Sequence, residues 1–516
     1  MEKYFAEVVE NHARQMPNHA AYIFMDHTIT YAQLHESILR MANAFLQLGL
    51  KKGDKIATIL PQSPAFVTLY MAASTLGLVV VPLDPRFKPA EMIALSKRTQ
   101  PKLLVALANP EPIKQTAEAL VSEYHFDHVF SYFGALNVEN AKPYEFLLQA
   151  PANPIPEALH PQPDDPLIII FTSGTTGKPK GAVLTQKITD TMAKATVEAW
   201  ELESDDKAII NLPTSHVGGT HDLLAVQLYA GATGVLMPTF DPRQMLEFIE
   251  KYKITYFGGV PTMFRLLFKM VDVRNYKVDS VKLIIVSGEP SQPELIQRIK
   301  ESFPSANLAS SWGMSETAGF FTFTKPSDSL ETVAKTEGAP WKGFELKIKK
   351  TTGDWAQTGE VGELLVKGDS VIQTYMDPED NTGTFEDGWL KTGDLGYLDE
   401  QNYLHFVGRL KEMYISGGYN VYPLEIESYL NAHPKINTSC IIEMPDEIFG
   451  EVGVAFVVPE EGTDLTAEEI ARYCEEGLAD YKRPKRIIIR KDLPKTLIGK
   501  LAKQEIRKNL NHYLSE

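Results

Sequence analysis

Short apolar runs alternate along most of the chain with longer segments in which apolar residues recur every three or four positions. The apolar runs have the length of buried strands, and the longer segments have the period of amphipathic helices. The strand-like runs are Lys55–Leu60, Leu103–Ala106, Leu167–Phe171, Gly234–Pro238 and Leu283–Val286, and clear helical segments are Tyr31–Leu48 and Arg243–Tyr252. This alternation predicts an α/β protein with layered, largely parallel sheets.

The longest apolar run extends from Phe66 to Leu83 and has the length of a membrane span. Gly77 and Pro82 interrupt it, so we expect a buried helix (Phe66–Leu76), a turn at Gly77 and a short strand (Val79–Val81) instead. The N-terminus lacks the basic end and apolar core of a signal peptide. We therefore expect a cytoplasmic protein with no transmembrane segment.

Composition narrows the class of protein. Of the 516 residues, 44% are hydrophobic and 23% charged, which is typical of a globular protein of about three domain-sized units. The formal net charge of −16 argues against a general nucleic-acid binder, because nucleic acid repels an acidic surface. Two cysteines, Cys440 and Cys474, are too few for a disulfide framework or a cysteine-rich metal site.

Charge is distributed unevenly near the C-terminus. Residues 441–480 hold 12 acidic residues and one basic residue, whereas residues 481–516 hold 11 basic residues and three acidic ones. Such a run is commonly a solvated face, and the alternative is a basic segment that is presented to a polyanionic ligand.

A loop rich in glycine, serine and threonine follows the apolar strand Leu167–Phe171. It consists of Thr172, Ser173, Gly174, Thr175, Thr176, Gly177 and Lys178, followed by Pro179, Lys180 and Gly181. The glycines allow the backbone to bend, and the hydroxyl and N–H groups can surround phosphate oxygens. The spacing differs from that of a Walker A loop, because no serine or threonine follows the lysine.

This loop resembles the phosphate loop of the adenylate-forming superfamily, which includes acyl-CoA synthetases, adenylation domains and luciferase-like enzymes. Four further motifs of the superfamily follow in order. They are Ser311–Thr317, Gly388–Asp394, the stretch from Gly408 through Gly417 and Gly418 to Glu427, and Pro494–Lys500. The resemblance therefore covers nearly the whole chain.

The resemblance implies an α/β fold of two domains. Residues 1–408 would form a large AMP-binding domain of layered α/β sheets with a small β-barrel-like subdomain. Residues 409–411 would form a hinge, and residues 412–516 a small, mobile α+β domain that carries a catalytic lysine, Lys500. In this superfamily the small domain rotates about the hinge between two half-reactions, and Lys411 stands at the pivot position.

The resemblance also implies sites for ATP and Mg²⁺. The Thr172–Lys178 loop would hold the β- and γ-phosphates, Ser315 the α-phosphate, and Glu316 the metal, since Mg²⁺ prefers oxygen ligands. Trp312 would stack on adenine, and Asp394, with Arg409 beside it, would accept hydrogen bonds from the ribose hydroxyls. Further residues expected around the nucleotide are Gly288, Glu289, Pro290, Gly313 and Met314. The basic tail would then dock toward the triphosphate.

The second half-reaction would use coenzyme A. Gly417 and Gly418 would leave room for its pantetheine arm. His216 matches the His or aromatic residue that gates the acyl pocket in acyl-CoA-forming members and helps to form the thioester. Lys500 would bridge the carboxylate and the α-phosphate in the first half-reaction and then move away.

The sequence indicates only in part which carboxylic acid is the substrate. Amino-acid-activating relatives carry an aspartate near the His216 region, and here none occurs before Asp222, which disfavours an amino acid. Gly313 stands where acetyl-CoA synthetases place a second bulky aromatic residue, which predicts an acid larger than acetate. Candidate lining residues are small and apolar: Gly218, Gly219, Gly258, Gly259, Val260, Pro261, Ala318 and Gly319. These features predict a fatty or aromatic acid.

Three functions remain open at this stage. The first is an acyl-CoA synthetase that consumes a small carboxylic acid, ATP and CoA. The second is a ligase that passes the acyl-adenylate to a carrier-protein pantetheine. The third is a non-catalytic acyl or nucleotide sensor, against which the intact Lys500, Glu316 and Asp394 argue. Homodimers are common in the superfamily, which makes a homodimer an expectation by analogy.

Overall fold

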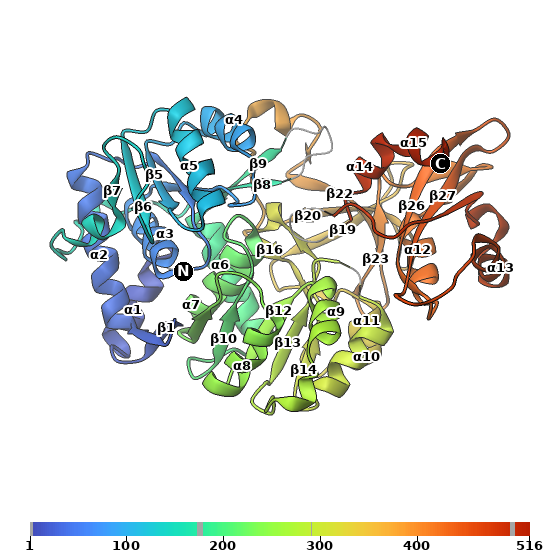
Figure 1. Cartoon of the computed structure of the whole chain (residues 1–516), viewed down its shortest axis with the longest axis horizontal. Helices are drawn as coiled ribbons and strands as arrows, with labels where there is room; N and C mark the ends of the chain where they lie inside the picture. The colour runs from blue at the N-terminus through green and yellow to red at the C-terminus, as the bar shows by residue number, and fades with distance from the viewer. Residues whose placement is uncertain (1–3, 173–178, 290, 496–500, 516) are drawn as a thin grey trace.

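The structure, a computed structural model, describes residues 4–172, 179–289, 291–495 and 501–515. Two seven-stranded sheets form most of the N-terminal part (Figure 1). The β5 sheet has the order β7 (Lys142–Pro143), β6 (His128–Tyr132), β5 (Leu103–Leu107), β3 (Lys55–Ile59), β4 (Val79–Pro82), β8 (Pro166–Thr172) and β9 (Lys180–Thr185). The β12 sheet has the order β14 (Asn307–Ala309), β13 (Leu283–Val286), β12 (Tyr256–Gly259), β10 (Lys207–Ile210), β11 (Thr233–Leu236), β1 (Ala20–Phe24) and β2 (His27–Thr30).

Both sheets are parallel except at one edge, where β9 and β2 run antiparallel to β8 and β1. Alternate residues of each strand belong to different cores, as the period-2 geometry of a strand requires. Ile56 of β3 faces the central core and Ala57 the outer one, and in the same way Ile210 of β10 faces the central core and Ile209 the outer one. Apolar residues on both faces explain why these strands read as continuous apolar runs.

Helices fill the layers on both sides of the two sheets. The central core contains α1 (Glu7–Gln15), α2 (Tyr31–Gln47), α3 (Pro64–Leu76), α6 (Gln186–Ala199) and α7 (Val226–Ala230). The outer face of the β5 sheet is covered by α4 (Pro89–Thr99) and α5 (Glu111–Glu123). The outer face of the β12 sheet is covered by α8 (Pro242–Tyr252), α9 (Pro261–Met270), α10 (Pro293–Ser302) and α11 (Leu330–Lys335). The layered α/β fold predicted from the sequence is confirmed.

The apolar run at Phe66 is the buried helix α3, which begins two residues earlier than predicted. The Ser63 hydroxyl accepts a hydrogen bond from the Phe66 N–H, Pro64 occupies the first turn, and Gly77 ends the helix in the left-handed conformation at φ +64°. Every helical residue from Ala65 to Leu76 is buried in the central core or against it. Among the described residues, no helix is both long enough and apolar enough to span a membrane.

Two five-stranded sheets follow in the chain (Figure 1). The first is antiparallel and contains β19 (Glu345–Lys349), β20 (Gly362–Lys367), β21 (Phe385–Glu386), β22 (Trp389–Leu398) and β23 (Leu404–Arg409). The second belongs to the small C-terminal domain and contains β24 (Tyr414–Ser416), β25 (Tyr419–Val421), β26 (Ile436–Asp446), β27 (Gly450–Pro459) and β28 (Arg486–Ile489). It is antiparallel except that β28 runs parallel to β27. Its helices are α12 (Pro423–Asn431), α13 (Ala467–Gly477), α14 (Lys503–Lys508) and α15 (Leu510–Ser515).

Candidate active site

The predicted phosphate loop connects two antiparallel strands, β8 and β9. Thr172 at the end of β8 pairs with Lys180 at the start of β9. The loop itself, with Ser173, Gly174, Thr175, Thr176, Gly177 and Lys178, lies outside the described residues. The hairpin therefore places both ends of the predicted loop at the same edge of the β5 sheet.

Glu316 lies beside the base of this hairpin. Its Oε1 accepts a hydrogen bond of 2.6 Å from the Tyr375 hydroxyl, and the Lys180 ammonium lies 4.9 Å from the centre of the Tyr375 ring. Burial raises the pKa of the Glu316 carboxyl, although the Tyr375 hydroxyl opposes this effect. Tyr375 thus contacts both the buried carboxyl of Glu316 and the ammonium of Lys180, and the three residues belong to separate segments of the chain.

Sequence reasoning did not identify Tyr375. Its strand-like segment pairs with β9 through a bridge to Ala182, and the Met376 N–H donates to the Gly181 carbonyl at 2.8 Å. These contacts join residues about 190 positions apart in the chain. A local motif could not have found Tyr375, because only tertiary pairing brings it to Glu316.

Trp312, Asp394 and Arg409 form a second cluster. The indole N–H of Trp312 donates to Asp394 Oδ2 at 3.0 Å, and Arg409 Nε lies 3.2 Å from Asp394 Oδ1. Asp394 and Arg409 are cross-strand partners in β22 and β23, which explains their proximity. The sequence predicted that these three residues share a site, and the structure brings them together. It adds that Trp312 orients the aspartate directly.

The glycine at position 313 has a backbone role. A Cβ atom there would lie 1.9 Å from the Gly319 carbonyl oxygen, because Gly313 and Met314 pair with Phe320 and Gly319 in a short antiparallel ladder. A glycine is therefore required at this position whatever the size of the acid. Met314 and Ser315 are partly buried beside this ladder.

His216 begins the segment that leads into a π-helix, η3 (Gly218–Ala225). Its Nδ1 accepts a hydrogen bond of 3.0 Å from the Gly218 N–H. When the ring is neutral, this contact leaves the proton on Nε2. π-Helices are rare and occur frequently at functional sites.

The turn after β13 contains Gly288 at φ +87°, a left-handed conformation that favours glycine. Glu289 follows it, and Pro290 lies outside the described residues. The Ser287 N–H donates to the Gly259 carbonyl, so this turn lies beside the carboxyl end of β12.

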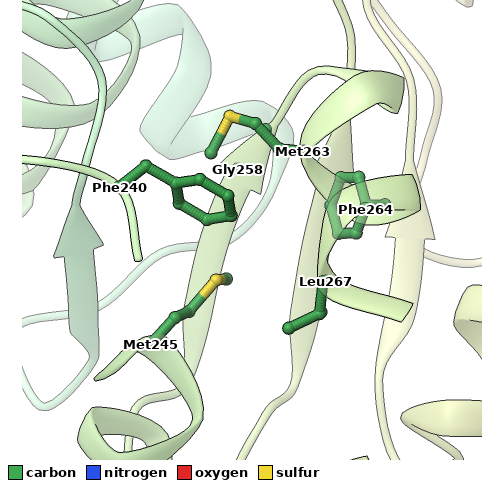
Figure 2. Close-up of a pocket in the computed structure, with 7 residues that line it drawn as sticks. Phe240, Met245, Gly258, Met263, Phe264 and Leu267 are labelled. Carbon is green, nitrogen blue, oxygen red and sulfur yellow. The ribbon is translucent and has the colours of Figure 1, made fainter. Parts of the chain in front are cut away.

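The glycines of β12, which the sequence predicted to line an acyl pocket, lie between two different environments. Figure 2 shows a small apolar pocket on one side, formed with side chains of α8 and α9. Its lining consists of Phe240, Met245, Gly258, Gly259, Met263, Phe264 and Leu267. On the other side, a Cβ on Gly258 would lie 3.5 Å from Leu223 Cδ2 of η3.

In the C-terminal domain, Gly417 and Gly418 form the two-residue turn between β24 and β25. Their φ angles are +57° and +86°, which are the conformations of a tight hairpin turn. Both glycines are exposed. Lys411 lies between β23 and β24, and desolvation together with the nearby Arg409 guanidinium lowers its pKa. Lys500 lies outside the described residues.

The basic tail is partly neutralised within its own domain. Lys503 lies 2.9 Å from both Glu412 and Glu427, and Arg507 lies 2.6 Å from Glu443. Several of its cations therefore stabilise the C-terminal domain. The interpretation that the basic excess docks toward a triphosphate stays a prediction for the other cations of the tail.

Comparison with known proteins finds matches along most of the chain. Residues 9–376 match the model of an AMP-binding enzyme, and residues 425–500 match the model of an AMP-binding enzyme C-terminal domain. The chain is 33% identical to 4-coumarate:CoA ligase 1 of Petunia hybrida, covering 94% of this chain and 90% of that protein. It is 32% identical to the indoleacetate–CoA ligase of Aromatoleum aromaticum, covering 97% of both.

A solved structure resembles the fold over nearly its full length. The o-succinylbenzoate coenzyme A synthetase of Bacillus subtilis, in complex with ATP and magnesium ion, matches with a TM-score of 0.84 at 28% identity. The match covers 97% of this chain and 99% of that one. The chain belongs to the AMP-binding enzyme family, the adenylate-forming superfamily, and within it is similar to the acyl-CoA synthetases.

Proposed function

We propose that this AMP-forming acid–CoA ligase, which uses ATP, Mg²⁺ and CoA, activates an aromatic carboxylic acid. The observation that carries the proposal is the end-to-end match to ligases named for 4-coumarate and indoleacetate. Both named acids are aromatic. The small, apolar residues predicted around the acid suit an aryl ring.

In the first half-reaction, a carboxylate oxygen attacks the α-phosphorus of ATP, and pyrophosphate leaves with the bonding electrons. Two anions must approach, so their repulsion has to be offset by cations and N–H dipoles. We assign this role to the Thr172–Lys178 loop and to Lys500. Lys180, at the base of the same hairpin, adds positive charge beside Tyr375, the hydrogen-bond partner of Glu316.

Glu316 fits the expected magnesium site. A carboxylate is a hard oxygen ligand of the kind that Mg²⁺ prefers, and the Glu316 carboxyl is buried with the Tyr375 hydroxyl as hydrogen-bond partner of Oε1. Among the described residues, no group of three acidic, histidine or cysteine side chains could hold a metal. Glu316 would hold Mg²⁺, and the ion would supply neutralisation of the phosphate charge.

Asp394 is assigned to the ribose, with Trp312 and Arg409 holding its carboxylate from two sides. Because Oδ2 already accepts the indole N–H, the orientation of the carboxylate is determined before the nucleotide binds. Trp312 is only 7% exposed, so its first role is to position Asp394. Stacking of its ring on adenine stays a prediction.

In the second half-reaction, the CoA thiol attacks the acyl carbon, AMP leaves, and the thiol proton is released. We propose that residues 412–516 rotate about the 409–411 hinge at Lys411 for this step, and that Gly417 and Gly418 then approach the acyl-adenylate. His216, with its Nδ1 occupied, would donate from Nε2 to an oxygen of the substrate.

The test is AMP release from ATP and Mg²⁺ with aryl, fatty and amino acids, each with and without CoA. CoA-dependent AMP release with aryl acids supports the proposal. A preference for fatty acids contradicts the substrate class. Pyrophosphate exchange without CoA-dependent AMP release contradicts CoA as the acceptor and favours a carrier-protein pantetheine.

A further inference from the structure

Arg98 is a charged residue that the mechanism above does not use. It stands in the last turn of α4, which packs on the outer face of the β5 sheet. Leu95 in the same turn is buried in that core, and the buried Thr99 hydroxyl donates to the Leu95 carbonyl at 2.9 Å. The side chain of Arg98 therefore extends from a helix end that is held firmly against the sheet.

The guanidinium of Arg98 contacts three segments that meet at the base of the β8–β9 hairpin. Its Nη1 donates to the Pro179 carbonyl at 2.9 Å, and its Nη2 donates to Asp377 Oδ2. The guanidinium carbon lies 5.4 Å from the centre of the Phe171 ring. Phe171 directly precedes the predicted phosphate loop and Pro179 directly follows it, so one side chain contacts both ends of the loop.

The third of these segments is the one that carries Tyr375 to Glu316. Tyr375 and Met376 pair with β9, and Asp377, which Arg98 contacts, follows them. The hydrogen bond from the Tyr375 hydroxyl to Glu316 begins two residues before this ion pair. Arg98 thus connects the end of the predicted phosphate loop to the segment that reaches the expected magnesium site.

A guanidinium suits this connection. Its donors form a planar fork with fixed directions, so it can hold a backbone carbonyl and a carboxylate at the same time, whereas lysine has a single ammonium. The side chains of Arg98 and Asp377 are only 19% and 22% exposed, and salt screens such a pair less than a fully exposed one. The contacts therefore oppose any separation of Pro179 from Asp377.

We propose that Arg98 is a positioning residue for ATP. By holding Pro179 and Asp377 together, it keeps the phosphate loop and Glu316 in a fixed relation, so that the phosphates and the metal that neutralises them are bound together. This inference rests on the proposed function, which assigns the loop to the phosphates and Glu316 to Mg²⁺. It adds a residue that lies outside the five motifs of the superfamily.

The experiment measures ATP–pyrophosphate exchange by the full chain at varied ATP and at varied acid. Arg98→Ala should raise the KM for ATP by about 10-fold, because hydrogen bonds that support the phosphate loop are lost. The KM for the acid should not change. Arg98→Lys should show part of the rise, since it keeps the charge without the fork. A merely structural role would not separate the two KM values.

Asp377→Ala tests whether Arg98 acts through its partner. We expect a smaller rise in the KM for ATP than in Arg98→Ala, because the contact to Pro179 is kept. The double variant should be no worse than Arg98→Ala, since both changes remove the same ion pair. A double variant in which the two increases multiply would show that the residues act independently, and the inference would be wrong. If Arg98→Ala does not fold, Arg98→Lys and Asp377→Ala give the same comparison.

Arg40→Ala is the matched control. Arg40 donates from Nη1 to the Ala150 carbonyl at 3.1 Å and from Nη2 to Glu36 at 2.7 Å, so it holds the same two kinds of acceptor. It lies in α2, apart from β8 and β9 (Figure 1). This variant should keep both wild-type KM values. Melting temperatures show whether each variant is folded.

The outcomes separate this inference from the proposed function. Pyrophosphate exchange reports adenylation alone, so the KM for ATP can be measured whichever acceptor or class of acid proves correct. If no acid supports exchange, the proposed function fails and the inference fails with it. If the wild type is active and folded Arg98→Ala keeps the wild-type KM for ATP, the inference alone is wrong. It is also wrong if Arg98→Ala and Arg40→Ala raise this KM equally.

Discussion

At the scale of single residues, the indole N–H of Trp312 determines how Asp394 presents its carboxylate. The 3.0 Å contact to Oδ2 and the 3.2 Å contact of Arg409 to Oδ1 hold the group on both sides. The tryptophan at position 312 therefore matters for its hydrogen bond to Asp394 as well as for packing. A tryptophan supplies an N–H that phenylalanine lacks.

Trp312→Phe tests this role. We expect the KM for ATP to rise about 10-fold, because a hydrogen bond to a charged group is lost while most of the ring is kept. Steady-state kinetics at varied ATP measure it. Trp200→Phe is the control, since Trp200 is equally buried and donates its N–H to the Thr324 carbonyl at 3.1 Å. Equal KM values in both variants would contradict the assignment.

Lys500→Ala tests the proposed catalytic lysine. We expect adenylation, measured by pyrophosphate exchange, to slow by about 100-fold or more, because the variant lacks a cation that stabilises charge in the transition state. Thioester formation from supplied acyl-AMP should be retained. Lys495→Ala is the matched control from the same tail, where the lysine lies 3.8 Å from Asp492. Normal adenylation by Lys500→Ala would show that another residue carries this role.

At the scale of elements, hairpins and turns determine where the predicted site residues lie. The β8–β9 hairpin presents the predicted phosphate loop, the Gly313–Phe320 ladder holds Glu316, and the β24–β25 hairpin presents two glycines. No atom lies within 4 Å of a Cβ built on Gly418. The glycine is therefore needed for its backbone conformation in this orientation of the chain.

Gly418→Ala should strain the turn by about 1 kcal/mol, because φ is +86°. We expect it to slow thioester formation and to leave pyrophosphate exchange unchanged. Gly462→Ala is matched, with φ +78°, no atom within 4 Å and a place in the same domain. It should lower the melting temperature to the same extent with no effect on either half-reaction. A similar loss of thioester formation in both variants would point to general strain.

At the scale of the whole molecule, stability depends on groups that join distant segments. Glu337 connects the end of the β12 sheet to β23, because its carboxyl accepts from the Ser310 hydroxyl at 2.6 Å and its N–H donates to the Leu404 carbonyl. Burial raises the pKa of Glu337 from its ordinary value of 4.5 to about 7. The folded state therefore binds this proton more tightly than the unfolded chain.

It follows that the contribution of Glu337 to stability falls as the pH rises from about 4.5 to about 7 and is level above that range. The melting temperature of the wild type relative to Glu337→Gln should decline across this window. Glu331→Gln should show the opposite slope at lower pH, because Lys335 lowers the pKa of the exposed Glu331. A constant difference between wild type and Glu337→Gln would contradict the assignment.

The sequence by itself determined the order of the motifs and placed the ends of the predicted strands and helices to within two residues. These depend on local periodicity and on short-range signals, such as Ser63, Pro64 and Gly77 around α3. The predicted strands Leu103–Ala106 and Leu283–Val286 agree with β5 and β13 to within one residue. The resemblance to the superfamily placed Arg409 beside Asp394, since both stand in its motifs.

Only the tertiary structure decided which side chains those motifs contact. Tyr375 reaches Glu316, Trp312 reaches Asp394, and Asp222 reaches Gly319 through pairings between segments far apart in the chain. The partners of the basic tail were equally hidden, because a sequence shows where charged residues lie but not which of them meet. Local pattern determines an element through its own backbone, whereas a site depends on distances between elements, and packing alone sets those distances.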